Sequence, residues 1–196
     1  MSLSHVWSFH WSTALPREEH PYAVYVHCFA HKLNLVLNGA CDLSEITATL
    51  QTVSDICTCF GSSPKRTNQL KNAIEKHCPE ARHFKLKKYC ATRWVERHDA
   101  IMFFHALYMA IVNVLSENAE LNLFNAVTSS SFLVGLHLIK EVFSVTKALS
   151  KSLQSKDLDF INAIIHVQDV ETMFNNWRSG DKSSQFVSAY AEASNF

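Results

Sequence analysis

Residues 29–64 read FAHKLNLVLNGACDLSEITATLQTVSDICTCFGSSP, and this stretch decides the class of fold that the sequence predicts. Apolar side chains recur in it at helical spacing from Leu33 to Phe60. That spacing places them on one face of a helix. Gly61–Pro64 reads GSSP, a typical helix stop, because glycine and proline both interrupt helical hydrogen bonding. The stretch therefore predicts helical structure that ends near Gly61.

The same helical spacing recurs along the rest of the chain. We expect four further helices, over residues 66–76, 100–115, 132–153 and 160–177, and a fraying tail after Gly180. The composition agrees, because the 196 residues hold only four glycines and four prolines while 47% of them are hydrophobic. Such a chain favours long helices around a core, and the composition argues against collagen-like, Pro-rich and turn-dense β structures.

Upstream of Phe29, residues Tyr22–Cys28 read YAVYVHC, which is rich in aromatic and β-branched side chains. These residue types favour extended backbone, so this segment is the best strand candidate in the chain. Residues 1–21 show no clear period. The predicted fold class is therefore mainly α, with one or two short strands near the N-terminal third.

Other features of the sequence bear on cellular location. The most apolar run, Ile101–Leu115, has 15 residues. A bilayer span needs roughly 20, so we expect a buried helix here and no membrane partner. The first 20 residues lack the sustained apolar core of a signal peptide. Six cysteines in this chain do not form a dense disulfide pattern. We therefore expect a nuclear or cytoplasmic protein with reduced thiols.

Basic and acidic side chains are equal in number, 18 of each, but they are unevenly placed. Residues 82–97 carry six cations against one anion, Glu96, whereas the flanking regions are mildly acidic. The cations are Arg82, Lys85, Lys87, Lys88, Arg93 and Arg97. Beside them, the Trp94 ring can stack on a nucleobase while the cations hold phosphates. The alternative is that Trp94 packs into the core and the cations form a solvated face.

The sequence offers little for catalysis or for a cofactor. Cys28 and His31 share a helical face at positions i and i+3, as metal ligands would, but no second pair with zinc spacing accompanies them. The four glycines are isolated, so we find no phosphate-cradling loop. No nucleophile has an oxyanion-hole motif beside it, and no trio of carboxylates can be nominated. We expect no cofactor and no small-molecule ligand.

Two motifs carry a resemblance to a known family: VHCFAHKLNLVL at Val26–Leu37 and CATRWVERHDAI at Cys90–Ile101. Together they resemble the hAT superfamily of transposases, in particular its domesticated branch of zinc-finger MYM-type and THAP-repressor-like proteins. LSKSLQ at Leu149–Gln154 also resembles that branch, and the match runs from about Tyr22 to Arg178. The resemblance implies a partial RNase H-like (α/β) catalytic domain plus part of an all-helical insertion.

The resemblance also implies roles for particular residues. In active members, two Asp and one Glu bind Mg²⁺ or Mn²⁺ and cut DNA. The family motif falls here on Cys28, His31, Arg93 and Trp94. By motif, His31 would lie near the scissile phosphate, and Trp94, supported by Arg93, would stack on a flipped base. The expected nucleic-acid-binding residues are therefore His31, Lys85, Lys87, Lys88, Arg93 and Trp94.

The chain departs from the family pattern at the catalytic carboxylates. The second catalytic Asp would fall within residues 1–12, which contain no carboxylate, and the other two would lie outside this chain. We therefore expect a non-matching segment over residues 1–21, a partial RNase H-like domain over 22–115 and a partial helical insertion over 116–196. The expected function is that of a catalytically inactive transposase-derived fragment with weak DNA contact.

Two alternatives stay open at this point. The helices can instead offer an apolar face to a protein partner, for example a full-length transposase-like relative, which would make the chain an interaction module. The chain can also be a non-functional expressed relic.

Overall fold

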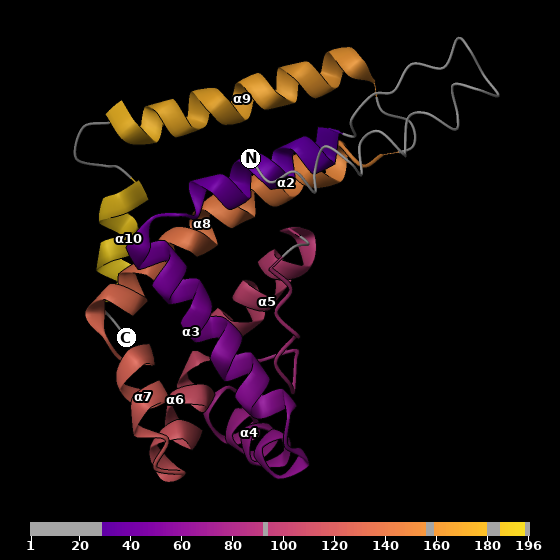
Figure 1. The fold of residues 1–196 in the computed structure, drawn as a ribbon. Helices are drawn as coiled ribbons and strands as arrows, with labels where there is room; N and C mark the ends of the chain where they lie inside the picture. Colours follow the sequence, from indigo (N-terminus) through magenta and orange to yellow (C-terminus); the bar gives the residue numbers. More distant parts are fainter. Residues whose placement is uncertain (1–28, 92–93, 156–158, 180–184, 195–196) are drawn as a thin grey trace, which may run out of the picture.

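The computed structural model describes residues 29–91, 94–155, 159–179 and 185–194, and helices account for most of this part of the chain (Figure 1). In chain order they are α2 (Phe29–Ala40), α3 (Ser44–Gly61), α4 (Pro64–His77), α5 (Trp94–Ala106), α6 (Tyr108–Glu117), α7 (Leu121–Val127), α8 (Ser130–Ser152), α9 (Phe160–Ser179) and α10 (Gln185–Ala193). The mainly helical class predicted from the sequence is confirmed.

The expected α/β character is not found in these ranges. The described residues contain no strand, so they show none of the sheet that an RNase H-like domain requires, because their apolar segments follow helical spacing. The predicted strand Tyr22–Cys28 lies outside the described residues. The predicted domain boundary after residue 115 stays a prediction; one hydrophobic cluster, from Leu37 to Phe143, includes residues on both sides of it.

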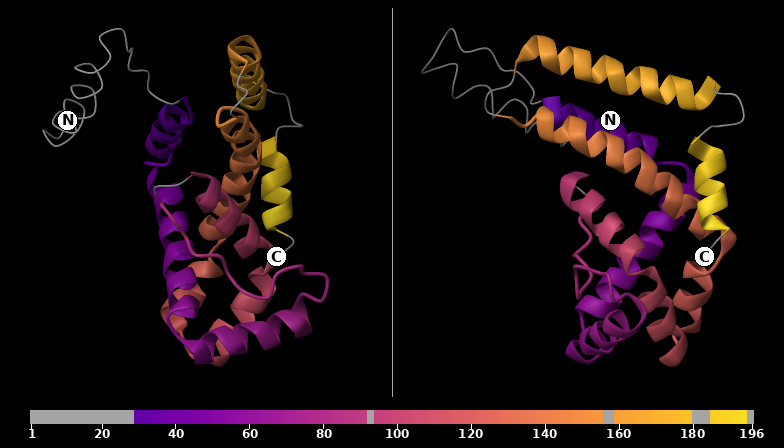
Figure 2. Two further views of the ribbon diagram at one scale, coloured as in Figure 1. Left: turned by 90° about the vertical axis from the view of Figure 1, so that its right-hand side faces the viewer. Right: turned by 180° about the vertical axis from the view of Figure 1, so that it is seen from behind.

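Helix α8 occupies the centre of the fold (Figures 1 and 2). Helices α3, α5 and α10 pack against it, while α2 and α9 lie beside its last turns at one end of the molecule. At the other end, α4 packs on α3 and α6, and α6 packs on α7. The core therefore runs along α8 and down into the corner formed by α3, α4, α5 and α6.

Polar residues at the helix starts explain several boundaries. The side chains of Ser63, Ser129 and Asp159 each accept a hydrogen bond from a backbone N–H in the first turn of α4, α8 and α9. Such caps satisfy donors that a helix leaves unpaired. Pro64 follows at the first position of α4, where its missing N–H costs nothing. These boundaries confirm the stop predicted at Gly61–Pro64 and the helix predicted from Arg66.

Two predicted helical runs are each broken in two. The first breaks at Cys41–Leu43, where the Thr47 hydroxyl donates to the Cys41 carbonyl at 2.8 Å and satisfies an acceptor at the end of α2. The second, over residues 100–115, bends by 70° between α5 and α6. The bend occurs at Leu107, which is fully buried. A straight helix would carry part of this apolar run into solvent, whereas the bent pair buries both halves.

Two short elements differ from the sequence expectation. The tail predicted to fray after Gly180 includes α10, which packs on α8 and buries Ala193. Lys140 of α8 and Glu192 of α10 add an ion pair at 3.4 Å. Helix α7 was not predicted, because its seven residues are too few to show a period.

No single helix within the described ranges is long and apolar enough to cross a membrane. Helices α5 and α6 reach the required length and hydropathy only as a bent pair, and their apolar side chains form much of the core.

Helices α3 and α8 approach closely at a glycine. A Cβ placed on Gly135 would lie 2.4 Å from Oγ1 and 3.3 Å from Cβ of Thr49. Thr49 is 3% exposed, and its hydroxyl donates to the Glu45 carbonyl at 2.8 Å, so this side chain has little room to move. The missing side chain of Gly135 therefore sets the distance between the two helices.

We predict that Gly135→Ala destabilises the fold by about 1–3 kcal/mol, because the overlap with Thr49 outweighs the roughly 1 kcal/mol by which alanine favours a helix. Urea unfolding followed by circular dichroism measures this. Gly39→Ala is the matched control, since a Cβ there meets nothing within 4 Å. Adding Thr49→Ala to Gly135→Ala should restore part of the loss, and the absence of any such coupling would contradict the proposed clash.

A pair of histidines lies where α5 crosses α8. The Nε2 atoms of His105 and His137 are 3.3 Å apart, and Nδ1 of the buried His137 lies 2.9 Å from the Leu133 carbonyl. Burial, with Lys140 and His137 nearby, lowers the pKa of His105 to about 4. The folded chain therefore keeps this ring neutral at pH values where an unfolded chain would protonate it.

We predict that the stability of the chain falls as the pH drops from about 6.5 to about 4, because only the unfolded state binds a proton at residue 105 in that window. His105 contributes at most about 3 kcal/mol to this fall. His105→Gln should flatten the profile measured by urea unfolding. A residual slope is expected from His98, whose pKa burial also lowers. The exposed His77→Gln serves as control, and an equal flattening there would contradict the prediction.

Candidate nucleic-acid interface

The cationic stretch lies in a segment without helix between α4 and α5, here called the connecting segment (residues 78–91). Its apolar side chains Ala81, Leu86 and Tyr89 are partly buried against the core. Between these anchors, Arg82 to Lys85 and Lys88 are exposed. The alternation of anchors and exposed residues holds an irregular backbone on the surface and presents its cations outward.

Arg97, a buried residue of α5, holds the connecting segment against the core. This arginine is only 6% exposed, and its guanidinium donates to the Asn38 side-chain carbonyl in α2 at 2.7 Å. The guanidinium carbon also lies 5.8 Å from the centre of the Tyr89 ring and 5.7 Å from the centre of the Phe143 ring. Both are cation–π distances. One buried cation of α5 thus connects α2, the connecting segment and α8.

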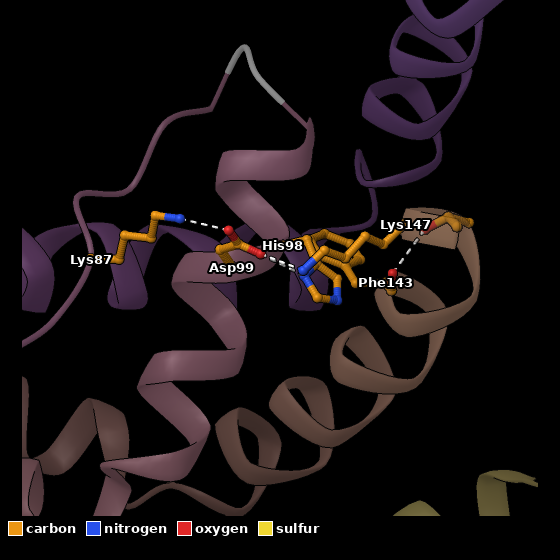
Figure 3. Close-up of polar contacts among 6 residues, drawn as sticks. Lys87, His98, Asp99, Phe143 and Lys147 are labelled. Carbon is orange, nitrogen blue, oxygen red and sulfur yellow. Dashed lines mark hydrogen bonds and ion pairs between the residues drawn. The ribbon is translucent and has the colours of Figure 1, made fainter. Parts of the chain in front are cut away.

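Asp99 makes a second connection two residues further along α5 (Figure 3). Its carboxylate accepts hydrogen bonds from Lys87 of the connecting segment and Lys147 of α8, each at 2.5 Å. His98 Nδ1 lies 3.3 Å from the same carboxylate. Burial alone would raise the pKa of Asp99, but hydrogen bonds from Lys147, Lys87 and His98 together outweigh it and hold the pKa well below the usual range. Asp99 is therefore ionised, and it binds the ammonium groups of Lys87 and Lys147.

A cationic groove opens where the connecting segment passes α4 and α5. It has a volume of about 410 Å³, and its walls are Thr67, Asn68 and Lys71 of α4, Arg82 to Lys85 of the connecting segment and Phe103 of α5. None of the described residues that line it is acidic. The His83 and Phe103 rings stack at 3.7 Å between centroids, which fixes one wall. The groove can therefore attract an anion and offer it aromatic surface.

The predicted site residues fall into three groups. Lys85 and Lys88 are exposed, and Lys85 lines the cationic groove. Lys87 is half-buried and paired with Asp99, so its charge is used within the fold. His31 lies within α2 and Trp94 begins α5, but their side chains are outside what the structure describes, as are Cys28 and Arg93 altogether. The structure therefore brings together only part of the expected set.

Lys71, Phe84 and Phe103 were missed as site residues by sequence reasoning. Phe103 reads as one more apolar residue of a helix, and Lys71 as a solvated charge on α4. The sequence does contain a signal for Phe84, because this large apolar residue stands between cationic residues. Arg82 belongs to the cationic stretch but is not among the nucleic-acid-binding residues that the sequence predicts. Their convergence depends on how α4, the connecting segment and α5 pack.

The described ranges contain no candidate metal site. No group of three or more His, Cys, Asp or Glu side chains comes together there in a way that could hold an ion. Within the described ranges, no disulfide links Cys41, Cys57, Cys59, Cys78 or Cys90.

Comparison with known proteins finds similar chains in two mammals. The human protein named 52 kDa repressor of the inhibitor of the protein kinase is 27% identical over 82% of this chain, and its mouse counterpart of the same name is 28% identical over the same share. The chain spans about a quarter of the length of these curated relatives, 25% in both cases. No family model matches the chain. No solved structure is similar to it at a significant level.

We predict that Asp99→Asn destabilises the chain by about 1–2 kcal/mol at neutral pH, because Lys87 and Lys147 lose a charged acceptor that they share. The pKa of Asp99 is lowered on folding, so its contribution is present above about pH 4 and is lost as the pH falls through the folded pKa. The difference in unfolding free energy between the variant and the parent should therefore become smaller as the pH falls below about 4.

Urea unfolding at several pH values measures this difference, and amide hydrogen exchange over residues 82–90 should accelerate in the variant. Asp55→Asn is the control, since Asp55 is exposed on α3 and accepts a hydrogen bond from Gln51 of the same helix. Unchanged exchange in the connecting segment would show that Asp99 does not hold it.

Proposed function

We propose that this chain is a domain derived from a hAT-type transposase and that it contacts DNA through the cationic groove without cleaving it. The similarity to the two repressors supports the origin, because they are proteins of the kind that the Val26–Leu37 and Cys90–Ile101 motifs resemble. The observation that carries the DNA contact is the groove itself, in which Lys71, Arg82 and Lys85 converge and no carboxylate stands among the described residues that line it.

The chemistry of the groove suits a phosphate backbone. Lys71, Arg82 and Lys85 are exposed, and Lys88 is exposed further along the connecting segment. A cation that meets a DNA phosphate releases condensed counterions, so such contacts favour binding at low salt and weaken as salt rises. Contacts of this kind carry no sequence information. The proposed binding is therefore non-specific and depends on ionic strength.

Lys87 is not part of the proposed contact surface, although it belongs to the same stretch. Its ammonium is already held by Asp99, and releasing it to a phosphate would leave that carboxylate with one cation fewer. His31, Arg93 and Trp94 keep their place in the proposal on the motif alone. The proposal also keeps the partial RNase H-like domain and helical insertion as the origin of these segments.

The proposed function excludes DNA cleavage because the sequence lacks an expected catalytic carboxylate. Phosphodiester cleavage by active relatives needs carboxylates that hold a divalent metal against both reacting oxygens. Residues 1–12, where the motif spacing would place one of them, read MSLSHVWSFHWS and hold none. Contact with phosphates needs only exposed cations, so it can persist where cleavage does not.

We predict that Arg82→Gln and Lys85→Gln each weaken binding to a DNA duplex about three- to tenfold at about 0.1 M salt and each reduce the salt slope of log K by about 1. Fluorescence anisotropy with a labelled duplex of about 20 base pairs measures both quantities at several salt concentrations.

Lys151→Gln is the control with the same change in net charge, because Lys151 is exposed in the last turn of α8 and does not line the groove. Equal effects of Lys85→Gln and Lys151→Gln would indicate that total charge alone matters and would contradict a defined contact surface.

Protein–protein contact is the second candidate function, and exposed apolar residues on α2, α9 and α10 favour it. Helices α2, α9 and α10 expose most of the large apolar side chains that the structure shows in solvent: Leu35, Val36, Ile161, Ile164, Ile165, Val167, Val187 and Tyr190. A concentration of this kind is typical of interaction surfaces. If the chain is an interaction module alone, the groove variants above should leave DNA affinity unchanged.

A further inference from the structure

Phe84 is a large aromatic residue placed in solvent within a charged groove. Its side chain is 52% exposed, and it stands between His83 and Lys85 on the wall of the cationic groove. Single exposed apolar residues are common and need no function. Phe84 differs from two other exposed apolar residues, Met109 and Leu121, because it lies with three cations that can hold a ligand beside it.

The backbone around Phe84 is held in place on both sides. His83 stacks on Phe103 of α5, with an angle of 15° between the rings. Leu86 packs against the core, and Lys87 is tied to Asp99. A ring presented from a fixed backbone loses less freedom on binding than a ring on a free loop. The Phe84 ring is thus presented from a pre-organised backbone and can stack on a flat ligand.

The aromatic rings and cations of the groove together favour single-stranded over duplex DNA. In a duplex, the faces of the bases are covered by their neighbours, so a protein ring finds no face to stack on unless the duplex is opened. In a single strand, the base faces are accessible, and proteins that bind single strands combine stacking rings with a cationic track for the backbone. The groove offers both within one cavity, with Lys71 on the α4 side and Arg82 and Lys85 on the other.

We propose that the cationic groove binds single-stranded DNA, with phosphates at Lys71, Arg82 and Lys85 and an unpaired base stacked on Phe84. This inference rests on the proposed DNA contact and names the form of DNA that the same site takes. Asn68, which is exposed on the α4 wall, offers amide donors and an acceptor to a base edge. Stacking on a ring tolerates any base, so the proposed site prefers unpaired DNA and not a particular sequence.

The test compares two probes on the 196-residue chain, a labelled oligothymidylate of about 20 nucleotides and a duplex of about the same length, by fluorescence anisotropy at equal salt. The chain should bind the single strand more tightly. Phe84→Leu keeps an apolar side chain but removes the ring, so it should weaken single-strand binding about five- to a hundredfold while duplex binding changes less than about twofold.

Matched variants separate the possible results. Phe84→Tyr keeps a ring and should bind the single strand like the parent. Met109→Leu alters a residue of similar exposure, 51%, on α6 and should leave the affinity for both probes unchanged. Circular dichroism and the urea midpoint, expected to be unchanged for these surface variants, show that each one folds.

Two results would overturn the inference in different ways. If Phe84→Leu binds the single strand as tightly as the parent while Lys85→Gln weakens both probes, the stacking site is wrong and the proposed DNA contact stands. If neither probe binds the parent chain at low salt, both the inference and the proposed function fail.

Discussion

The Asp99 carboxylate accepts hydrogen bonds from Lys87 and Lys147, and the surface of the connecting segment depends on this arrangement. Asp99 lies on α5, so it connects that helix to α8 on one side and to the connecting segment on the other (Figure 3). Two residues earlier, Arg97 joins the same segment to α2 and α8 through Asn38, Tyr89 and Phe143. The beginning of α5 thus holds a non-helical segment in one path by charge and by ring contacts, where no backbone ladder is available.

This arrangement divides one cationic stretch into two kinds of charge. Lys87 and Arg97 are paired within the fold, with Asp99 and Asn38. Arg82, Lys85 and Lys88 are exposed to solvent, while the apolar residues beside them, Leu86 and Tyr89, pack against the core. A fold that pairs some cations and leaves others exposed can keep a charged surface in one geometry without relying on the exposed charges for its own stability.

Under the proposed function, DNA contact without cleavage has a physical reason. Cleavage demands several carboxylates placed around a metal to within fractions of an ångström, and the loss of one removes it. Phosphate contact demands only cations near a surface of the right shape, and its energy is spread over several residues. A groove such as that of Lys71, Arg82 and Lys85 is therefore more tolerant of sequence change than a metal centre.

The sequence alone predicts the helical class, several helix boundaries and the location of the cationic stretch, because helical spacing, caps such as Ser63 and charge runs are local properties. Tertiary packing accounts for the bend between α5 and α6 at Leu107, for the packed helix at residues 185–193 and for which cations remain exposed. It alone brought Lys71 and Phe103 to Phe84. These outcomes depend on contacts between residues far apart in the chain, and no local pattern records which distant side chain will pair with Lys87.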